Sequence, residues 1–189
     1  MNTYCPCLRK SIPGGGVSIA DFGGGNGYLA DWIRLEFPNT KILYTVYETK
    51  KIAEGYNRLS KDLEINFVDA NRFGEKLYDL IIISGTLHVV ENWKEILTLS
   101  SQIADNVLLM RVPMTDADKH EFLIQNASAE VYGLSHASWP IIFFSRGLLL
   151  KEIQNMFEIV LELTDIEESF PSHGKKFFMR SLLLKTQSN

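Results

Sequence analysis

The feature that most constrains the fold is a glycine-rich segment, Gly23–Gly27, in which four of five residues are glycine. The apolar run Val17–Phe22 comes directly before it and predicts a strand, and the pattern of Gly27–Phe37 predicts a helix. Glycine tolerates positive φ and has no Cβ to hold a ligand away, so we expect a tight turn that a ligand can approach closely. The first turn of the helix would offer free N–H groups to a carboxylate or phosphate.

Beyond this segment, short apolar runs alternate with stretches of helical period, which predicts βαβ units around a parallel sheet. Leu80–Ile83 is continuously apolar, as is typical of a strand covered on both faces. Further strands are expected at Lys41–Tyr47, Glu64–Val68, Tyr78–Ser84 and Asn106–Arg111, and helices at Lys50–Leu59 and Asn92–Ile103.

The stretch after the fifth strand has a different pattern. Thr115–Asn126 predicts a short helix, because Thr115 and Asp118 have the spacing of a capping box. The aromatic stretch Ala127–Pro140 is expected to be irregular, and Tyr132–Phe144 is expected either to line a substrate pocket or to pack as core.

The last part of the chain predicts one helix and two strands. Ser145 is expected to cap a helix that ends near Phe157. Ile159–Leu163 alternates like a strand and Lys176–Lys185 is rich in β-forming residues. No helix pattern separates these two strands, so they should pair antiparallel.

These elements predict a Rossmann-like α/β fold with a seven-stranded, mostly parallel sheet, an antiparallel last strand and helices on both faces. Residues 1–16 are expected to be irregular, and residues 17–189 to form a single domain of ordinary size.

Composition excludes several classes of protein. An apolar share of 46% and a charged share of 22% are ordinary for a globular protein, and a net charge of −4 argues against a broad nucleic-acid-binding face. Cys5 and Cys7 alone supply neither a disulfide framework nor a zinc site, and His120, His136 and His173 lack metal-ligand spacing. The sequence shows no signal peptide and no apolar run of the ~20 residues that a membrane helix needs, so we expect a cytoplasmic protein.

Polar residues follow the predicted strands where open α/β sheets bind ligands. Glu48 ends the second strand and could accept hydrogen bonds from both hydroxyls of a ribose. Asp69 follows the third strand, placed to meet an adenine amino group, and the small Ser84-Gly85 pair follows the fourth. Each feature also has an interpretation without a ligand: Gly23–Gly27 as a tight turn only, Glu48 as a solvated glutamate, and Asp69 as an ordinary aspartate at a strand end.

The pattern Asp21-x-Gly23-x-Gly25-x-Gly27 is similar to motif I of class I S-adenosylmethionine (SAM)-dependent methyltransferases. Glu48, Asp69 and the segment Tyr78–His88 resemble the later cofactor motifs of that family, and the resemblance covers about residues 17–185. It implies that SAM is the cofactor and that its methionine part, ribose and adenine are held, in that order along the chain, by strand-end residues. The implied cofactor residues are Asp21, Gly23, Gly24, Gly25, Asn26, Glu48, Asp69, Ala70, Ser84 and Gly85.

A narrower resemblance is to a subgroup of methyltransferases often associated with surface-polysaccharide biosynthesis. It rests on the triple glycine Gly23–Gly25, Ser84–Leu87, Arg111–Pro113, Trp139-Pro140 and Phe143-Phe144. One departure from the wider family is that only twenty residues precede Asp21, where related enzymes usually carry helices that cover the cofactor. This departure fits a truncated form, a site closed by another subunit, or a site too open for efficient catalysis.

Two residues are candidates for catalysis. His88, just past the fourth strand, could act as general base, and Arg111, at the end of the fifth, could bind an anionic substrate or form a surface ion pair. The expected function is SAM-dependent methyl transfer to a small-molecule or sugar-like acceptor. A non-catalytic SAM-fold protein or partner subunit is one alternative. An NAD(P)-dependent oxidoreductase is another, because Gly25-x-Gly27-x-x-Ala30 and Glu48 fit a dinucleotide fingerprint, although Asp21 and the antiparallel last strand do not belong to it.

Overall fold

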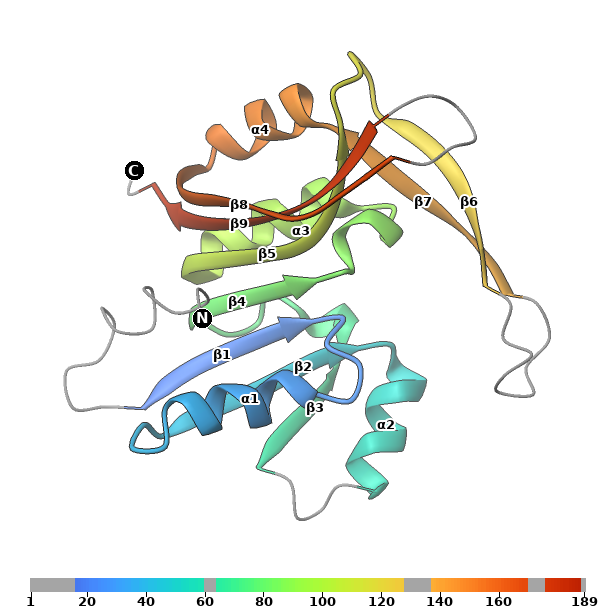
Figure 1. Ribbon diagram of the computed structural model, residues 1–189. Helices are drawn as coiled ribbons and strands as arrows, with labels where there is room; N and C mark the ends of the chain where they lie inside the picture. Colours follow the sequence, from blue (N-terminus) through green and yellow to red (C-terminus); the bar gives the residue numbers. More distant parts are fainter. Residues whose placement is uncertain (1–15, 60–63, 128–136, 170–175, 188–189) are drawn as a thin grey trace.

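The computed structural model describes residues 16–59, 64–127, 137–169 and 176–187 (Figure 1). The expectations for Cys5, Cys7, His136 and His173 lie outside these residues. The strands are β1 (Val17–Phe22), β2 (Ile42–Glu48), β3 (Ile65–Asp69), β4 (Tyr78–Ser84), β5 (Ala104–Thr115), β6 (Glu121–Ala127), β7 (Ala137–Ser145), β8 (Phe157–Ser169) and β9 (Lys176–Thr186). The helices are α1 (Tyr28–Glu36), α2 (Lys50–Leu59), α3 (Trp93–Ile103) and α4 (Arg146–Gln154), with short 3₁₀ helices η1 (Ala70–Arg72) and η2 (Leu87–Val89).

The sheet is parallel over β3-β2-β1-β4-β5, and β9 then pairs antiparallel with β5 and with β8. This confirms the mostly parallel sheet with an antiparallel last strand. The strand order reverses between β1 and β4, because β2 and β3 lie on one side of β1 while β4 and β5 lie on the other. Open α/β sheets bind ligands at the carboxyl ends of the strands beside such a reversal.

Helices cover both faces of the sheet, as predicted (Figure 1). Successive residues of β4 point to opposite faces, so that Ile82 packs with α1 and α2 whereas Ile81 packs with α3 and α4. Both side chains are almost fully buried. The continuous apolar run in β4 is therefore explained by burial on two faces.

The prediction of a helix at Thr115–Asn126 is wrong. β5 continues through Thr115, and Glu121–Ala127 forms β6, which pairs antiparallel with β7 in a hairpin. The Thr115 hydroxyl accepts a hydrogen bond from the Ala117 N–H at 3.3 Å, so the capping signal belongs to a turn and not to a helix start. This hairpin supplies the two strands beyond the seven predicted, and the described residues form nine.

The end of β5 also differs from the prediction. We expected a strand over Asn106–Arg111, but it runs on to Thr115 after a register shift against β9 between Leu109 and Val112. Arg111 lies in this bulge and has a φ of 55°. The carboxyl end of β5 is therefore bent where it reaches the ligand-binding edge of the sheet.

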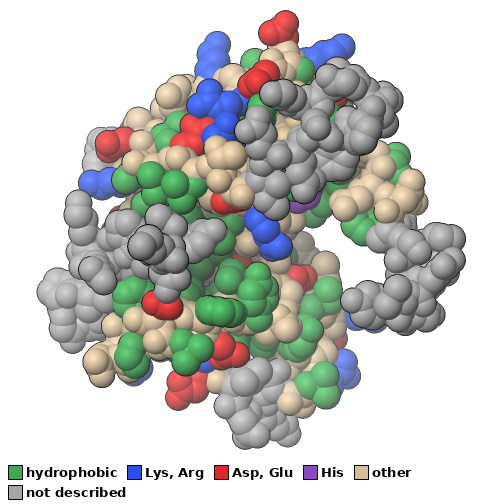
Figure 2. Space-filling model, in the orientation of Figure 1, with side chains coloured by type: hydrophobic (Ala, Val, Ile, Leu, Met, Phe, Trp, Pro, Cys, Tyr) green, Lys and Arg blue, Asp and Glu red, His purple; other side chains and the backbone are tan. Residues whose placement is uncertain are grey.

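The helix predicted after β7 is present. The Ser145 hydroxyl accepts a hydrogen bond from the Leu148 N–H at 3.5 Å and caps α4, which ends at Gln154. No helix in the described parts of the chain has the length and apolar character needed to cross a membrane. Acidic and basic side chains are interspersed over the described part of the face in Figure 2, without a broad area of one sign.

Candidate cofactor and acceptor site

The predicted cofactor residues meet along one edge of the sheet. Asp21 is the penultimate residue of β1. Glu48, Asp69 and Ser84 are the last residues of β2, β3 and β4, respectively. Glu48 is in register with Asp69, and Asp21 pairs with Ile82 of β4. Parallel strands that end in register therefore bring together residues that are up to 63 positions apart in the sequence.

The glycine turn is held by backbone geometry and by internal packing. Gly23 has a φ of 71°, and its N–H donates to the Tyr47 carbonyl at 2.8 Å. A Cβ on Gly23 would overlap the Thr86 side chain, whose hydroxyl donates to the Gly23 carbonyl at 3.3 Å. Glycine at this position is thus required by the fold itself, whether or not a ligand approaches the backbone.

A buried carboxylate lies under the turn. Asp21 is fully buried and accepts a hydrogen bond from the Tyr44 hydroxyl at 2.7 Å through Oδ2, whereas Oδ1 has no partner among the described residues. Burial is the main cause that raises the pKa of Asp21 to about 6. A Cβ on Gly24 would overlap this carboxylate. The turn therefore covers an acceptor oxygen that an ammonium group or a water could satisfy.

Glu48 faces the glycine turn. Its Oε1 accepts from the Gly25 N–H at 3.0 Å and its Oε2 from the Thr49 N–H at 3.0 Å. A Cβ on Gly25 would meet nothing within 4 Å, so Gly25 borders open space. The Asn26 side chain accepts from the Tyr28 N–H at 3.2 Å and so supports the start of α1.

The third and fourth strand ends complete the row. Asp69 is half-buried and caps η1, because its Oδ1 accepts from the Asn71 N–H at 3.0 Å, and the half-buried Ala70 follows it. Ser84 is buried at the end of β4, and Gly85 turns away with a φ of 66° while its N–H donates to the Met110 carbonyl at 2.9 Å.

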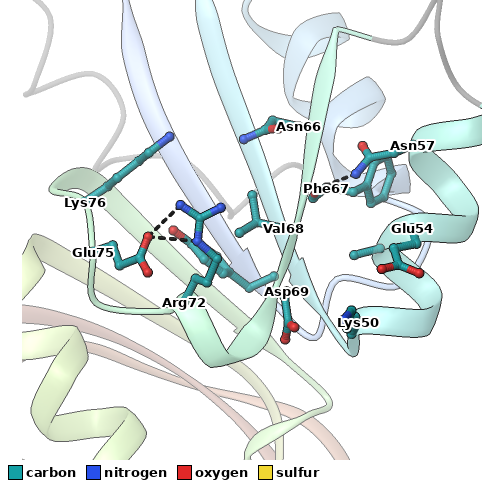
Figure 3. A pocket seen from close by; sticks show the side chains of 12 residues that line it. Lys50, Glu54, Asn57, Asn66, Phe67, Val68, Asp69, Arg72, Glu75 and Lys76 are labelled. Atoms are coloured by element: carbon teal, nitrogen blue, oxygen red, sulfur yellow. Dashed lines mark hydrogen bonds and ion pairs between the residues drawn. The ribbon is translucent and has the colours of Figure 1, made fainter.

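A cavity of about 390 Å³ lies at the outer edge of β3, between α2 and the loop after η1 (Figure 3). On one side Arg72 pairs with Glu75 at 2.8 Å, and on the other the Asn57 amide donates to the Phe67 carbonyl at 2.8 Å. Asp69 is the one predicted cofactor residue among those that line this cavity, so the cavity is separate from the glycine turn.

A second cavity, of about 420 Å³, brings the two catalytic candidates together. His88, in η2, is half-buried and its Nδ1 has no partner among the described residues. Burial, with a smaller contribution from the Arg111 charge, lowers the pKa of His88. Arg111 borders the same cavity, and its Nε lies 3.3 Å from the Ser84 hydroxyl.

The hairpin supplies two further residues of this cavity. Gln125 of β6 and Trp139 of β7 line this cavity and are directly paired across the hairpin. The sequence predicted a helix at Gln125. For the aromatic stretch that contains Trp139 it predicted either the lining of a substrate pocket or packing in the core. The missed signal was Phe122-Leu123-Ile124, three successive apolar residues of β-forming type opposite the apolar β7.

The geometry defines a Rossmann-like α/β fold with a candidate site at its switch point. No family model and no curated protein matches the sequence. Among solved structures, the N-terminal domain of EvdMO1 with SAH bound is 14% identical over 95% of this chain and 78% of that chain, with a TM-score of 0.60. The glycopeptide N-methyltransferase MtfA is 11% identical over 93% and 85%, with a TM-score of 0.56.

A second EvdMO1 structure, obtained in the presence of SAH and D-fucose, has a TM-score of 0.59 at 16% identity over 95% of this chain and 80% of that chain. The chain thus has the fold of class I SAM-dependent methyltransferases.

Proposed function

We propose that this protein binds SAM at the row of strand ends and transfers its methyl group to a small-molecule or sugar-like acceptor. The observation that carries the proposal is the glycine turn at the switch point, with the Glu48 carboxylate bonded to the Gly25 N–H beside open space. The fold supports it, because solved relatives with this fold bind SAM or SAH.

The cofactor roles implied by the resemblance fit the chemistry of the residues. Asp21 Oδ1 is a buried acceptor without a partner among the described residues, suited to the ammonium group of the methionine part. Glu48 is oriented by two backbone N–H groups, and its oxygens keep further lone pairs for the ribose hydroxyls. Asp69 with Ala70 would face the adenine, and the compact Ser84-Gly85 pair would lie beneath the cofactor.

Bound SAM supplies an electrophilic methyl group on a sulfonium. The protein has to hold the acceptor atom in line with that methyl, and positioning of this kind can contribute about 7–11 kcal/mol. We assign His88 as general base, a role typically worth about 10²–10⁴-fold. Its lowered pKa favours the neutral imidazole at neutral pH, which is the form that can accept a proton.

The acceptor class draws on two further lines of support. The narrower sequence resemblance is to methyltransferases associated with surface-polysaccharide biosynthesis, and one structural relative was crystallised with D-fucose present. Other structural relatives are a glycopeptide N-methyltransferase and a mitomycin 7-O-methyltransferase. A sugar-like acceptor is therefore proposed ahead of other small molecules.

Thermal unfolding with SAH or NADH tests the cofactor. A ligand at 100 times its Kd stabilises a folded protein by about 2.7 kcal/mol, so we expect SAH to raise the Tm and NADH to leave it unchanged. Glu48→Gln should weaken SAH binding about tenfold or more, because a charge-assisted hydrogen bond is lost. The matched control is Glu54→Gln, on α2 beside the cavity at the edge of β3, which should bind SAH normally.

The outcomes separate the alternatives. Stabilisation by NADH and not by SAH would favour an oxidoreductase and end the proposal. Tight SAH binding without methyl transfer from SAM to any sugar in an acceptor screen would favour the non-catalytic SAM-fold protein.

A further inference from the structure

The cavity beside Gly85 has a composition that identifies a class of acceptor, an inference that rests on the proposed function. Its lining residues come from η2, the bent end of β5, β9 and the hairpin of β6 and β7, together with Gly85 after β4. The hairpin is joined to the parallel sheet at the end of β5, where Met114 and Thr115 pair with Phe144 and Ser145.

Arg111 reaches this cavity because the backbone is bent for it. Its φ of 55° is rare for a residue with a side chain and costs on the order of 1–3 kcal/mol. The register shift in β5 spans this residue, and bulges of this kind re-aim side chains next to functional sites. The guanidinium lies over the end of β4, with its Nη2 3.4 Å from the Ser84 carbonyl.

Arg111 has no ion-pair partner among the described residues. The Ser84 hydroxyl and carbonyl are its hydrogen-bond partners, and no carboxylate among the described residues forms an ion pair with it. Other arginines of the fold differ, since Arg72 pairs with Glu75 and Arg146 with Glu162. A guanidinium that borders a cavity without an ion-pair partner is suited to bidentate binding of a carboxylate.

The opposite wall is an aromatic ring with an amide beside it. Trp139 is half-buried against the apolar cluster of Ile141, Phe143 and Phe177, which holds its ring in place. Gln125 is exposed and lies directly across the hairpin from Trp139, on the same face. Such a pair can contact the flat face of a ring and hydrogen-bond to a group on its edge.

We propose that this cavity binds a ring-shaped acceptor that carries both a hydroxyl and a carboxylate. The carboxylate binds Arg111, the ring lies against Trp139, and the hydroxyl points to His88. The hydroxyl oxygen forms the new bond to the methyl carbon as the carbon–sulfur bond breaks and its electron pair stays on sulfur. The hydroxyl proton passes to His88 and then to water, so charge balances with the loss of the sulfonium.

Titration calorimetry on SAH-saturated protein tests the assignment with two matched pairs of probes. D-glucuronate is compared with D-glucose, and 4-hydroxybenzoate with 4-hydroxybenzyl alcohol, so that each pair differs in the carboxylate. We expect the acid of one pair to bind about tenfold or more tightly than its neutral partner. The pair that responds tells whether the ring is a sugar or an aromatic acid.

Variants locate the preference. Arg111→Gln should abolish the preference for the acid and leave the affinity for SAH unchanged. Trp139→Leu should weaken the binding of the acid and of its neutral partner equally. The control Arg72→Gln removes an exposed arginine at the edge of β3 and should change neither measurement.

Three results would overturn the inference. The first is that the acids show no binding at millimolar concentration. The second is that the preference for the acid survives in Arg111→Gln. The third is that Arg111→Gln weakens SAH binding instead, which would place Arg111 in the cofactor site. Each differs from failure of the proposed function itself, which would appear first as wild-type protein that does not bind SAH.

Discussion

At the scale of single residues, the glycines of one motif are required at their positions for different physical reasons. Gly23 is fixed by its positive φ and by Thr86, Gly24 by the Asp21 carboxylate, and only Gly25 borders open space. A ligand-binding motif is thus partly a packing motif. It follows that a bulky residue at position 23 would disturb the fold before it could report on cofactor binding.

Asp21 should make stability depend on pH. Its pKa is raised from 3.8 to about 6, so between these values the folded state binds more protons than the unfolded state. Its contribution is therefore fully present below about pH 4 and is lost as the pH rises through 6, by roughly 3 kcal/mol at most. Denaturant unfolding from pH 4.5 to 7.5 should show this fall in wild type and a smaller one in Asp21→Asn, and equal slopes would contradict it.

Arg111 offers a direct test of backbone strain. Arg111→Ala and Arg111→Gly both remove the guanidinium, but only glycine adopts a φ of 55° without steric cost. We expect the glycine variant to be the more stable of the two by about 1 kcal/mol, measured by denaturant unfolding. If alanine is the more stable, the strain assigned to this residue is absent.

At the scale of elements, the hairpin of β6 and β7 lines the proposed acceptor cavity with Gln125 and Trp139. Its two faces have different surroundings. Phe143 is 5% exposed and its ring centroid lies 4.2 Å from that of Phe177, whereas Phe122 is 73% exposed. β7 is buried on both faces, because Ile142 and Phe144 lie in the main core whereas Phe143 lies in the smaller cluster with Phe177. The face of Phe143 also presents Trp139 and Gln125.

This asymmetry predicts different costs for the same substitution. Phe143→Ala should lower the free energy of unfolding by about 3–5 kcal/mol through lost packing, and Phe122→Ala should change it by less than about 0.5 kcal/mol. Denaturant unfolding of both variants is the measurement. Equal losses at the two positions would mean that this segment does not pack as a strand pair.

At the scale of the whole molecule, the site exists because of strand order. Asp21, Glu48 and Ser84 come from three strands that end together, and the reversal between β1 and β4 leaves room above them. The antiparallel β9 then pairs with β5, whose bent end carries Arg111 to the proposed acceptor cavity. The cofactor side and the acceptor side of the candidate site therefore meet at Ser84 and Gly85.

The amino-acid sequence alone was enough to predict the parallel sheet, the helices on both faces, the antiparallel last strand and the row Asp21, Glu48 and Asp69. Periodicity and glycine content are local properties, and a strand buried on both faces has a recognisable composition. The same local reasoning also placed Ser145 correctly at the start of α4.

Only the tertiary structure decided the conformation of Glu121–Ala127 and the position of Arg111. A capping signal at Thr115 favoured a helix, but pairing with β7, a segment more than ten residues away, outweighed it. The positive φ of Arg111 depends on the register of β5 against β9, which is set by residues near the end of the chain. Long-range pairing of this kind leaves no local pattern, and for that reason the contribution of Gln125 to the cavity beside Gly85 could not be predicted from the sequence.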